Sequence, residues 1–154
     1  MLLLLVALAL AAHRYFLQTG VSPRPAPGSA SAACGAAEDC FAGYVTGVVD
    51  GDTLDIGGTR IRLVLVDAPE HDTRAGPAAT RHLLELCPVS SEAEVYRDWL
   101  QPTDEYGRTL AVVWCGGKRV NEEMIRSGRA QLYRRFCRDS AFGIEPWAIE
   151  LGCR

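Results

Sequence analysis

Three short runs in the first half of the chain share an alternating or β-branched apolar pattern that predicts strands: Tyr44 to Val49, Thr53 to Ile56 and Thr59 to Val66. Gly57 and Gly58, between the second and third runs, are typical of a tight hairpin. Pro69 cannot donate to a strand ladder, so the third run is expected to end in a loop. The pattern therefore predicts a three-stranded meander that leads into residues 67–70.

The second half alternates helical and strand-like patterns. The expected elements are a helix from Pro77 to Leu86, strands over Glu94 to Leu100 and Thr109 to Cys115, and a helix from Glu122 to Ser127. Asn121 is expected to cap the last helix and Gly128 to end it. One more short helix is expected at most after Ser140, because Gly143 and Pro146 interrupt the tail.

Five strands with a helix between the third and fourth follow the order of an OB-fold. The fold class expected is α+β, a five-stranded OB-fold barrel with two or three short helices. The chain of 154 residues has room for one such domain, which is expected over 41–154.

The first 40 residues have a different pattern. Leu2 to Ala12 is an unbroken apolar run, too short for the roughly 20 residues of a membrane-spanning helix, so 1–19 is expected to be a signal peptide or a short membrane anchor. Residues 20–40 are rich in Pro, Ser and Ala and are expected to form a linker, which disfavours burial of the apolar run as a core helix. A secreted or cell-envelope protein is therefore expected.

Composition narrows the possible functions. A hydrophobic content of 48% and a charged content of 23% exclude disorder over most of the chain. A net charge of −3 argues against wrapping nucleic acid by summed positive charge. This net charge is compatible with an enzyme that binds one or two phosphates at a local site.

The six cysteines form no Cys-x-x-Cys pair and no zinc pattern. In an exported domain they are expected to form disulfides, and the preferred pairing joins neighbours in sequence: 34 with 40, 87 with 115 and 137 with 153. Free buried cysteines in a cytosolic protein are the alternative.

Charged side chains in and after the apolar runs suggest phosphodiester chemistry. Arg62 lies inside an apolar strand, and Arg108 lies in a Tyr-Gly-Arg turn. Guanidinium groups can each make two parallel bonds to phosphate oxygens, although an exposed strand face could also carry Arg62 without any function. Glu70 could orient or deprotonate a water, and Asp52 and Asp67 could hold a hard cation such as Ca²⁺. Taken singly, a plain turn and a solvated loop acid remain the simpler interpretations of Asp52 and Glu70.

Four segments together resemble the staphylococcal nuclease (thermonuclease) family: 48–53, 61–70, 104–111 and 120–130. The resemblance implies an OB barrel and a calcium-dependent endonuclease that cleaves DNA and RNA and leaves 3′-phosphates. It implies roles for residues that match the family motifs: calcium binding by Asp52, Asp67 and the backbone carbonyl of Ala68, a phosphate clamp of Arg62 and Arg108, a water positioned by Glu70, and substrate binding by Tyr106.

Three features depart from the family pattern. The loop 71–76 is short, Glu105 stands where a lysine is usual, and Tyr133 to Phe136 lack the tyrosines that stack on the nucleotide base. The sequence therefore predicts a monomeric nuclease acting on DNA and RNA, with a possible membrane tether through its N-terminus. The alternatives are a non-catalytic OB module that binds nucleic acid or protein, and a disulfide-stapled structural domain, which would explain neither the arginines nor the loop acids.

Overall fold

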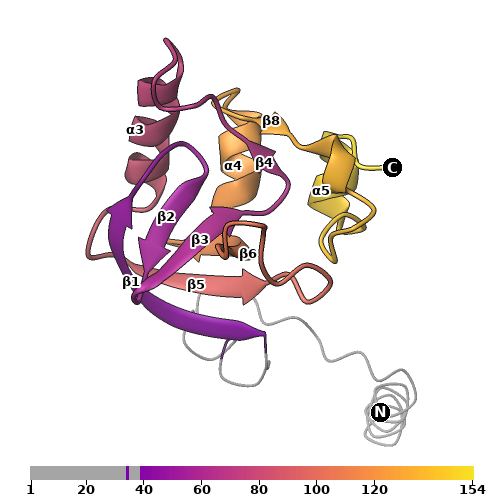
Figure 1. Cartoon of the computed structure of the whole chain (residues 1–154), viewed down its shortest axis with the longest axis horizontal. Coiled ribbons are helices and arrows are strands. Elements are labelled where there is room, and N and C mark those ends of the chain that lie inside the picture. Colours follow the sequence, from indigo (N-terminus) through magenta and orange to yellow (C-terminus); the bar gives the residue numbers. More distant parts are fainter. Residues whose placement is uncertain (1–33, 35–38) are drawn as a thin grey trace, which may run out of the picture.

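The computed structural model describes Cys34 and residues 39–154, so the predicted leader over 1–19 and most of the linker lie outside the described residues. Its centre is a five-stranded barrel (Figure 1) of β1 Cys40–Val48, β2 Thr53–Ile56, β3 Thr59–Leu63, β5 Glu92–Arg97 and β6 Thr109–Cys115. Neighbouring strands pair antiparallel in the order β3-β2-β1-β5-β6. A parallel pairing of β3 with β6, with Ile61 opposite Thr109, closes the barrel. The predicted α+β OB-fold is therefore confirmed.

The other elements are short: β4 Val66–Asp67, α3 Gly76–Leu86, β7 Lys118–Arg119, α4 Val120–Arg126, β8 Gln131–Leu132, η2 Arg134–Phe136 and α5 Pro146–Leu151. β7 extends the sheet beyond β6, and β4 pairs with β8 as a separate two-stranded ladder. Within residues 39–154, none of the helices is long and apolar enough to cross a membrane.

Local sequence signals located most strands well. β2 and β6 have the predicted bounds, and both Gly57 and Gly58 adopt positive φ in the hairpin, as a two-residue turn requires. The third strand is shorter than expected, because Leu65 adopts a φ of 62° and breaks the run after Leu63. Val66 then begins a new strand, β4, that pairs away from the barrel.

One prediction about the helices was wrong. Asn121 does not cap α4. It lies inside the helix, fully buried, where its amide accepts a hydrogen bond from the Val113 N–H and donates to the carbonyls of Val64 and Ala111. The one short helix allowed after Ser140 is present as α5, and Pro146 begins this helix rather than limiting it, because a proline in the first helical turn removes no helical hydrogen bond.

The core has two parts. Apolar side chains from all five barrel strands fill the barrel with Leu83 of α3 and Met124 of α4. A smaller cluster, which includes Val64 and Trp147, packs α5 against the outside of the barrel. The three predicted disulfides are present: Cys34–Cys40, Cys87–Cys115 and Cys137–Cys153.

Candidate active site

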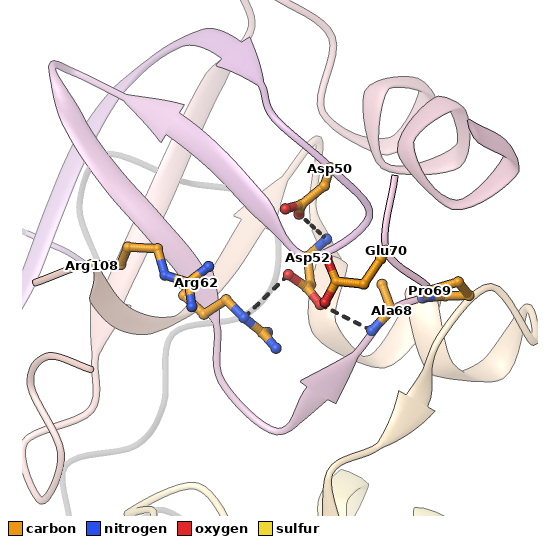
Figure 2. A pocket seen from close by; sticks show the side chains of 7 residues that line it. All are labelled: Asp50, Asp52, Arg62, Ala68, Pro69, Glu70 and Arg108. Carbon is orange, nitrogen blue, oxygen red and sulfur yellow. Dashed lines mark hydrogen bonds and ion pairs between the residues drawn. The ribbon is translucent and has the colours of Figure 1, made fainter. Parts of the chain in front are cut away.

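A small polar pocket of about 90 Å³ lies at one end of the barrel (Figure 2) and brings together seven residues: Asp50, Asp52, Arg62, Ala68, Pro69, Glu70 and Arg108. They come from the turn after β1, from β3, from the loop after β4 and from the turn before β6. A larger surface hollow of about 400 Å³ lies on the β2–β3 hairpin, but its charged lining is only the Arg60–Asp55 pair. The polar pocket is therefore the candidate site.

Asp52 is the buried acid of this pocket, with 7% of the residue exposed. One carboxylate oxygen, Oδ2, accepts the Ala68 N–H at 2.9 Å, and Oδ1 lies 3.1 Å from Arg62 Nε. Burial raises the pKa of Asp52 from 3.8 to about 6, although the Arg62 charge and the Ala68 N–H act in the opposite direction. The nearby charge of Asp50 raises it further. Arg62 and the Ala68 N–H therefore offset only part of the cost of burying this carboxylate.

Arg62 is held in place by the bend that ends β3. Its Nη1 donates to the carbonyls of Leu63 at 3.0 Å and Val66 at 2.7 Å, and its Nε faces Asp52. The bend at Leu65 allows the carbonyl of Val66 to fold back to this position. Nη2 bonds to none of the residues that the structure describes, so it remains available to an anion in the pocket.

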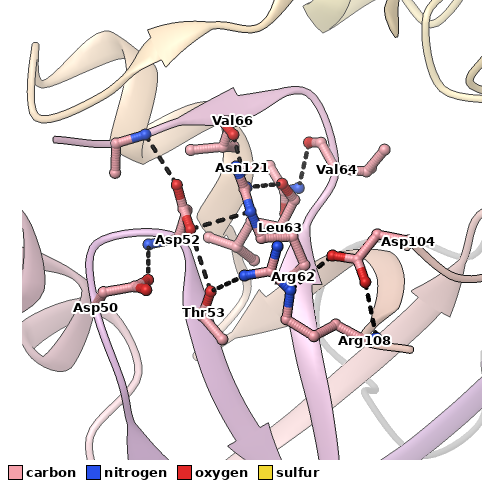
Figure 3. A network of polar contacts seen from close by, with 11 residues as sticks. Asp50, Asp52, Thr53, Arg62, Leu63, Val64, Val66, Asp104, Arg108 and Asn121 are labelled. Atoms are coloured by element: carbon pink, nitrogen blue, oxygen red, sulfur yellow. Dashed lines mark hydrogen bonds and ion pairs between the residues drawn. The ribbon is translucent and has the colours of Figure 1, made fainter. Parts of the chain in front are cut away.

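Arg108 is oriented by its own turn (Figure 3). Its Nε donates to Asp104 Oδ2 at 2.6 Å, and Asp104 Oδ1 accepts the backbone N–H groups of Tyr106 and Arg108. Although burial opposes the shift, these hydrogen bonds from Arg108 and Tyr106 hold the pKa of Asp104 below its ordinary value. Arg108 Nη1 donates to Thr53 Oγ1 at 3.3 Å, and Thr53 in turn donates to Asp52 Oδ1 at 3.2 Å. One polar network therefore joins both arginines through Asp52 and Thr53.

Glu70 lines the pocket from a loop that close packing fixes. Its carbonyl accepts the N–H of Thr73 at 3.0 Å and the Thr73 hydroxyl at 2.7 Å. A Cβ at Gly76 would lie 2.0 Å from the same carbonyl, so only glycine allows the start of α3 to approach this closely. The backbone of Glu70 is thus fixed, while the residue itself is exposed at the pocket.

Five of the seven predicted site residues share the pocket: Asp52, Arg62, Ala68, Glu70 and Arg108. Asp67 is exposed on β4 and does not line the pocket. Tyr106 is 75% exposed and also lies outside the lining, with the Arg108 guanidinium carbon 5.3 Å from its ring centroid. The structure adds Asp50 to the lining, and Thr53 and Asp104 to the network (Figure 3). The Asp-Gly-Asp turn was a sequence signal for Asp50, but nothing in the sequence marked the Thr53 hydroxyl.

The pocket supplies the ligand chemistry of a hard divalent cation. Its donors are the carboxylates of Asp50, Asp52 and Glu70, which are oxygen ligands of the kind that Ca²⁺ and Mg²⁺ prefer. The raised pKa of Asp52 fits a place where a cation would offset burial. Within 39–154, however, no three Asp, Glu, His or Cys side chains converge closely enough to form a complete metal site.

Comparison with known proteins adds an independent finding. The sequence model of a protein family described as "Staphylococcal nuclease homologue" matches residues 60–143, more than half of this chain. A micrococcal nuclease of Shigella flexneri is 34% identical over 109 residues, which cover 62% of this chain and 60% of that protein. An uncharacterized endonuclease of Escherichia coli O157:H7 is 34% identical over 102 residues, covering 63% and 64%. Protein ParB of Escherichia coli is 33% identical over 109 residues, covering 60% and 57%. The chain thus spans about six tenths of the length of these relatives.

Proposed function

The chain belongs to the staphylococcal nuclease homologue family, and from that premise we propose that it is a metal-dependent endonuclease that hydrolyses phosphodiester bonds of DNA and RNA. The observation that carries the proposal is the pocket itself, in which two fixed guanidinium groups and three carboxylates surround a volume of about 90 Å³. The endonuclease name of relatives that are 34% identical supports the same class of reaction.

Arg62 and Arg108 would hold the phosphate. Each guanidinium is anchored to protein acceptors through Nε and Nη1, and each keeps its Nη2 without a bond to another described residue. Donors fixed before the substrate arrives stabilise the charge that develops on the phosphate oxygens without reorganising during the reaction. The Thr53 hydroxyl and Asp104 act as positioning groups, since they contact Arg108 rather than the pocket volume.

Glu70 would orient the attacking water and accept its proton. It is the exposed acid of the lining, whereas the oxygens of Asp52 are already engaged by Arg62, Thr53 and the Ala68 N–H. A general base needs an oxygen that is free to take a proton, so Glu70 is the better candidate.

We propose Ca²⁺ as the metal, held by Asp52, Asp67 and the backbone carbonyl of Ala68. Bound there, the ion would neutralise phosphate charge and polarise the phosphorus centre. The carboxylates that line the pocket support an ion of this type, and so does the burial of Asp52, which its partners offset only in part. The exposed carboxylate of Asp67 directly precedes Ala68, which lines the pocket. Tyr106, beside Arg108, is proposed to contact the substrate next to the clamped phosphate.

We further propose that the protein is a monomer that works outside the cytosol, secreted or tethered to the cell envelope through its N-terminal apolar segment. Three disulfides in one small domain support this proposal, because such bridges persist in oxidising compartments.

The test is cleavage of single-stranded DNA and of RNA by the full chain with its disulfides formed, with added calcium and with a chelator. Calcium-dependent cleavage that leaves 3′-phosphate ends is expected. A folded protein that binds these nucleic acids without cutting them would favour the non-catalytic OB module, and cleavage that persists in the chelator would remove the metal from the proposal.

A further inference from the structure

A segment near the C-terminus concentrates positive charge that the pocket does not use. Residues 129–138, which we call the arginine segment, contain Arg129, Arg134, Arg135 and Arg138. All four are exposed, and none forms an ion pair with another residue in the described part of the chain. In a chain of net charge −3, this is a local excess of unpaired cations.

Strand pairing places this segment beside the strand that enters the pocket. β8 lies within it and pairs antiparallel with β4, with Leu132 opposite Val66 and Gln131 opposite Asp67 (Figure 1). The Tyr133 N–H extends the contact by donating to the Leu65 carbonyl at 2.9 Å. β4 continues directly into Ala68, Pro69 and Glu70 of the pocket lining. The arginine segment therefore begins next to the candidate site and leads away from it.

The backbone of the segment is fixed at both ends. The N–H groups of Arg129 and Ala130 donate to the Met124 carbonyl near the end of α4, and the Cys137–Cys153 bridge ties the other end to the second residue after α5. Arg135 lies over the ring of Phe136, with its guanidinium carbon 5.6 Å from the centroid. The arginines are thus displayed from an ordered surface, which lowers the entropic cost of binding a ligand across several of them.

We propose that the arginine segment is a phosphate track that binds the sugar–phosphate backbone of the nucleic acid next to the bond in the pocket. This inference rests on the proposed nuclease function and extends it from one phosphate to a run of nucleotides. Guanidinium groups match phosphate oxygens with paired donors, and contacts to phosphates do not depend on the base sequence. Asp67 lies opposite Gln131 in the ladder and Asp139 follows Arg138 in sequence, so these acids are fewer than the four arginines. The track favours long strands over very short ones.

The test compares two variants of the protein. One lacks three positive charges of the track, and the other lacks three positive charges elsewhere on the surface. The track variant is Arg129→Gln/Arg135→Gln/Arg138→Gln. Arg134 is kept because its guanidinium packs against Gly152, where a Cβ would lie 3.0 Å from its Nη2. The control variant is Arg81→Gln/Lys118→Gln/Arg154→Gln, which changes the net charge equally at exposed positions on α3, on β7 and at the C-terminal residue.

Binding is measured on a labelled single strand of about 20 nucleotides, in chelator, across a series of salt concentrations. Each phosphate contact contributes about −0.7 to the slope of log affinity against log salt for single strands. The track variant is therefore expected to bind about tenfold more weakly at low salt, with a slope smaller by about 2, and the control variant is expected to keep the wild-type slope. Equal slopes for the two variants overturn the track.

Cleavage with calcium provides the second readout. The track variant is expected to raise KM about tenfold on the 20-nucleotide strand and to keep the wild-type kcat/KM on a dinucleotide, because only the long substrate reaches the arginines. Equal losses on both substrates overturn the track, since they indicate a damaged pocket. If the wild type binds with the expected salt slope but does not cleave, the proposed nuclease fails while the track stands. If the track variant loses binding only to anionic lipid vesicles, the segment serves a membrane surface and the track is wrong.

Discussion

The polar network at the pocket contains acids and arginines, and so does a second charged cluster at α4, which consists of Arg119, Glu122 and Arg126. The two groups balance their charges in opposite ways. At the pocket, the buried Asp52 has a pKa raised to about 6 because its burial outweighs the help of Arg62. On α4, Glu122 receives hydrogen bonds from Arg119 and Arg126, which hold its pKa below the ordinary value although burial opposes them. A carboxylate whose partners outweigh its burial stabilises the fold. A carboxylate whose burial outweighs its partners is stabilised further when a cation binds to it.

The arginines of the two clusters also differ in how far the surrounding protein encloses them. Arg119 is enclosed by Trp114 and Trp147, at 4.7 and 5.4 Å from their ring centroids, and it is paired with Glu122 at 2.7 Å. Arg62 and Arg108 instead line the open pocket (Figure 2), whereas the nitrogen of Arg119 that has no hydrogen-bond partner among the described residues, Nε, is buried. The comparison predicts that changes at the pocket alter turnover, and that changes on α4 alter stability.

The largest effect is expected from the pocket residues that would touch the reacting phosphate and water. Arg62→Ala and Glu70→Gln are each expected to lower turnover by roughly two to four orders of magnitude, through loss of a charge-stabilising donor or of a general base. Steady-state cleavage of single-stranded DNA with calcium measures this, and thermal unfolding of each variant provides the folding control. A variant with near-normal turnover would remove its residue from the mechanism.

The second-largest effect is expected on the free energy of unfolding as a function of pH, in the absence of metal. Because the pKa of Asp52 is raised from 3.8 to about 6, the folded protein holds a proton that the unfolded chain releases between these values. The free energy of unfolding therefore falls as pH rises from about 4 to about 6, by roughly 3 kcal/mol at most, at about 1.4 kcal/mol for each pKa unit.

Asp52→Asn is expected to remove this decline, since the amide does not titrate. Calcium is expected to reduce the decline in the wild type, because a bound cation favours the ionised carboxylate. Denaturant unfolding in chelator between pH 4 and pH 7, for both proteins, measures the difference. An identical pH slope in Asp52→Asn would show that this carboxylate is not the strained group of the pocket.

Local signals account for the parts of this structure that the sequence predicted. The alternation of β2 and β6, the Gly57-Gly58 hairpin and the arginine inside an apolar strand are all properties of a few adjacent residues. The pairing of cysteines that are neighbours in sequence was also confirmed.

Features that depend on distant partners were missed. The apolar run from Thr59 to Val66 looks continuous, and only the left-handed conformation of Leu65 reveals that it divides. Asn121 resembled a helix cap because one of its partners, the Val64 carbonyl, is 57 positions away in sequence. The same holds for Thr53, whose hydroxyl meets Arg108 across 55 positions of chain. Such contacts appear only when the barrel has closed.

A smaller effect is expected from Arg119, the enclosed arginine of the α4 cluster. Arg119→Ala removes its contacts with two tryptophans and leaves Glu122 with one arginine instead of two. A loss of about 2 kcal/mol in the free energy of unfolding is expected, with unchanged kcat on a dinucleotide. Urea unfolding and the cleavage assay separate the two readouts, and a fall in kcat without a loss of stability would contradict the division between the clusters.

The smallest effect is expected from Glu122→Gln, and it tests the comparison most directly. The lowered pKa of Glu122 means that its ionised form adds stability above its ordinary pKa of 4.5, and that this contribution disappears as pH falls through the folded value. The pH slope is therefore opposite in sign to that of Asp52. Since its partner Arg126 is 45% exposed, a loss of only about 0.5–1 kcal/mol near pH 7 is expected, and a smaller loss at pH 3. Urea unfolding at the two pH values measures this difference. Turnover should not change, because the hydrogen bonds of Glu122 run to Arg119 and Arg126, and neither arginine lines the pocket. A fall in turnover in this variant would show that the helix transmits charge changes to Arg62, and the two clusters would then act as one unit.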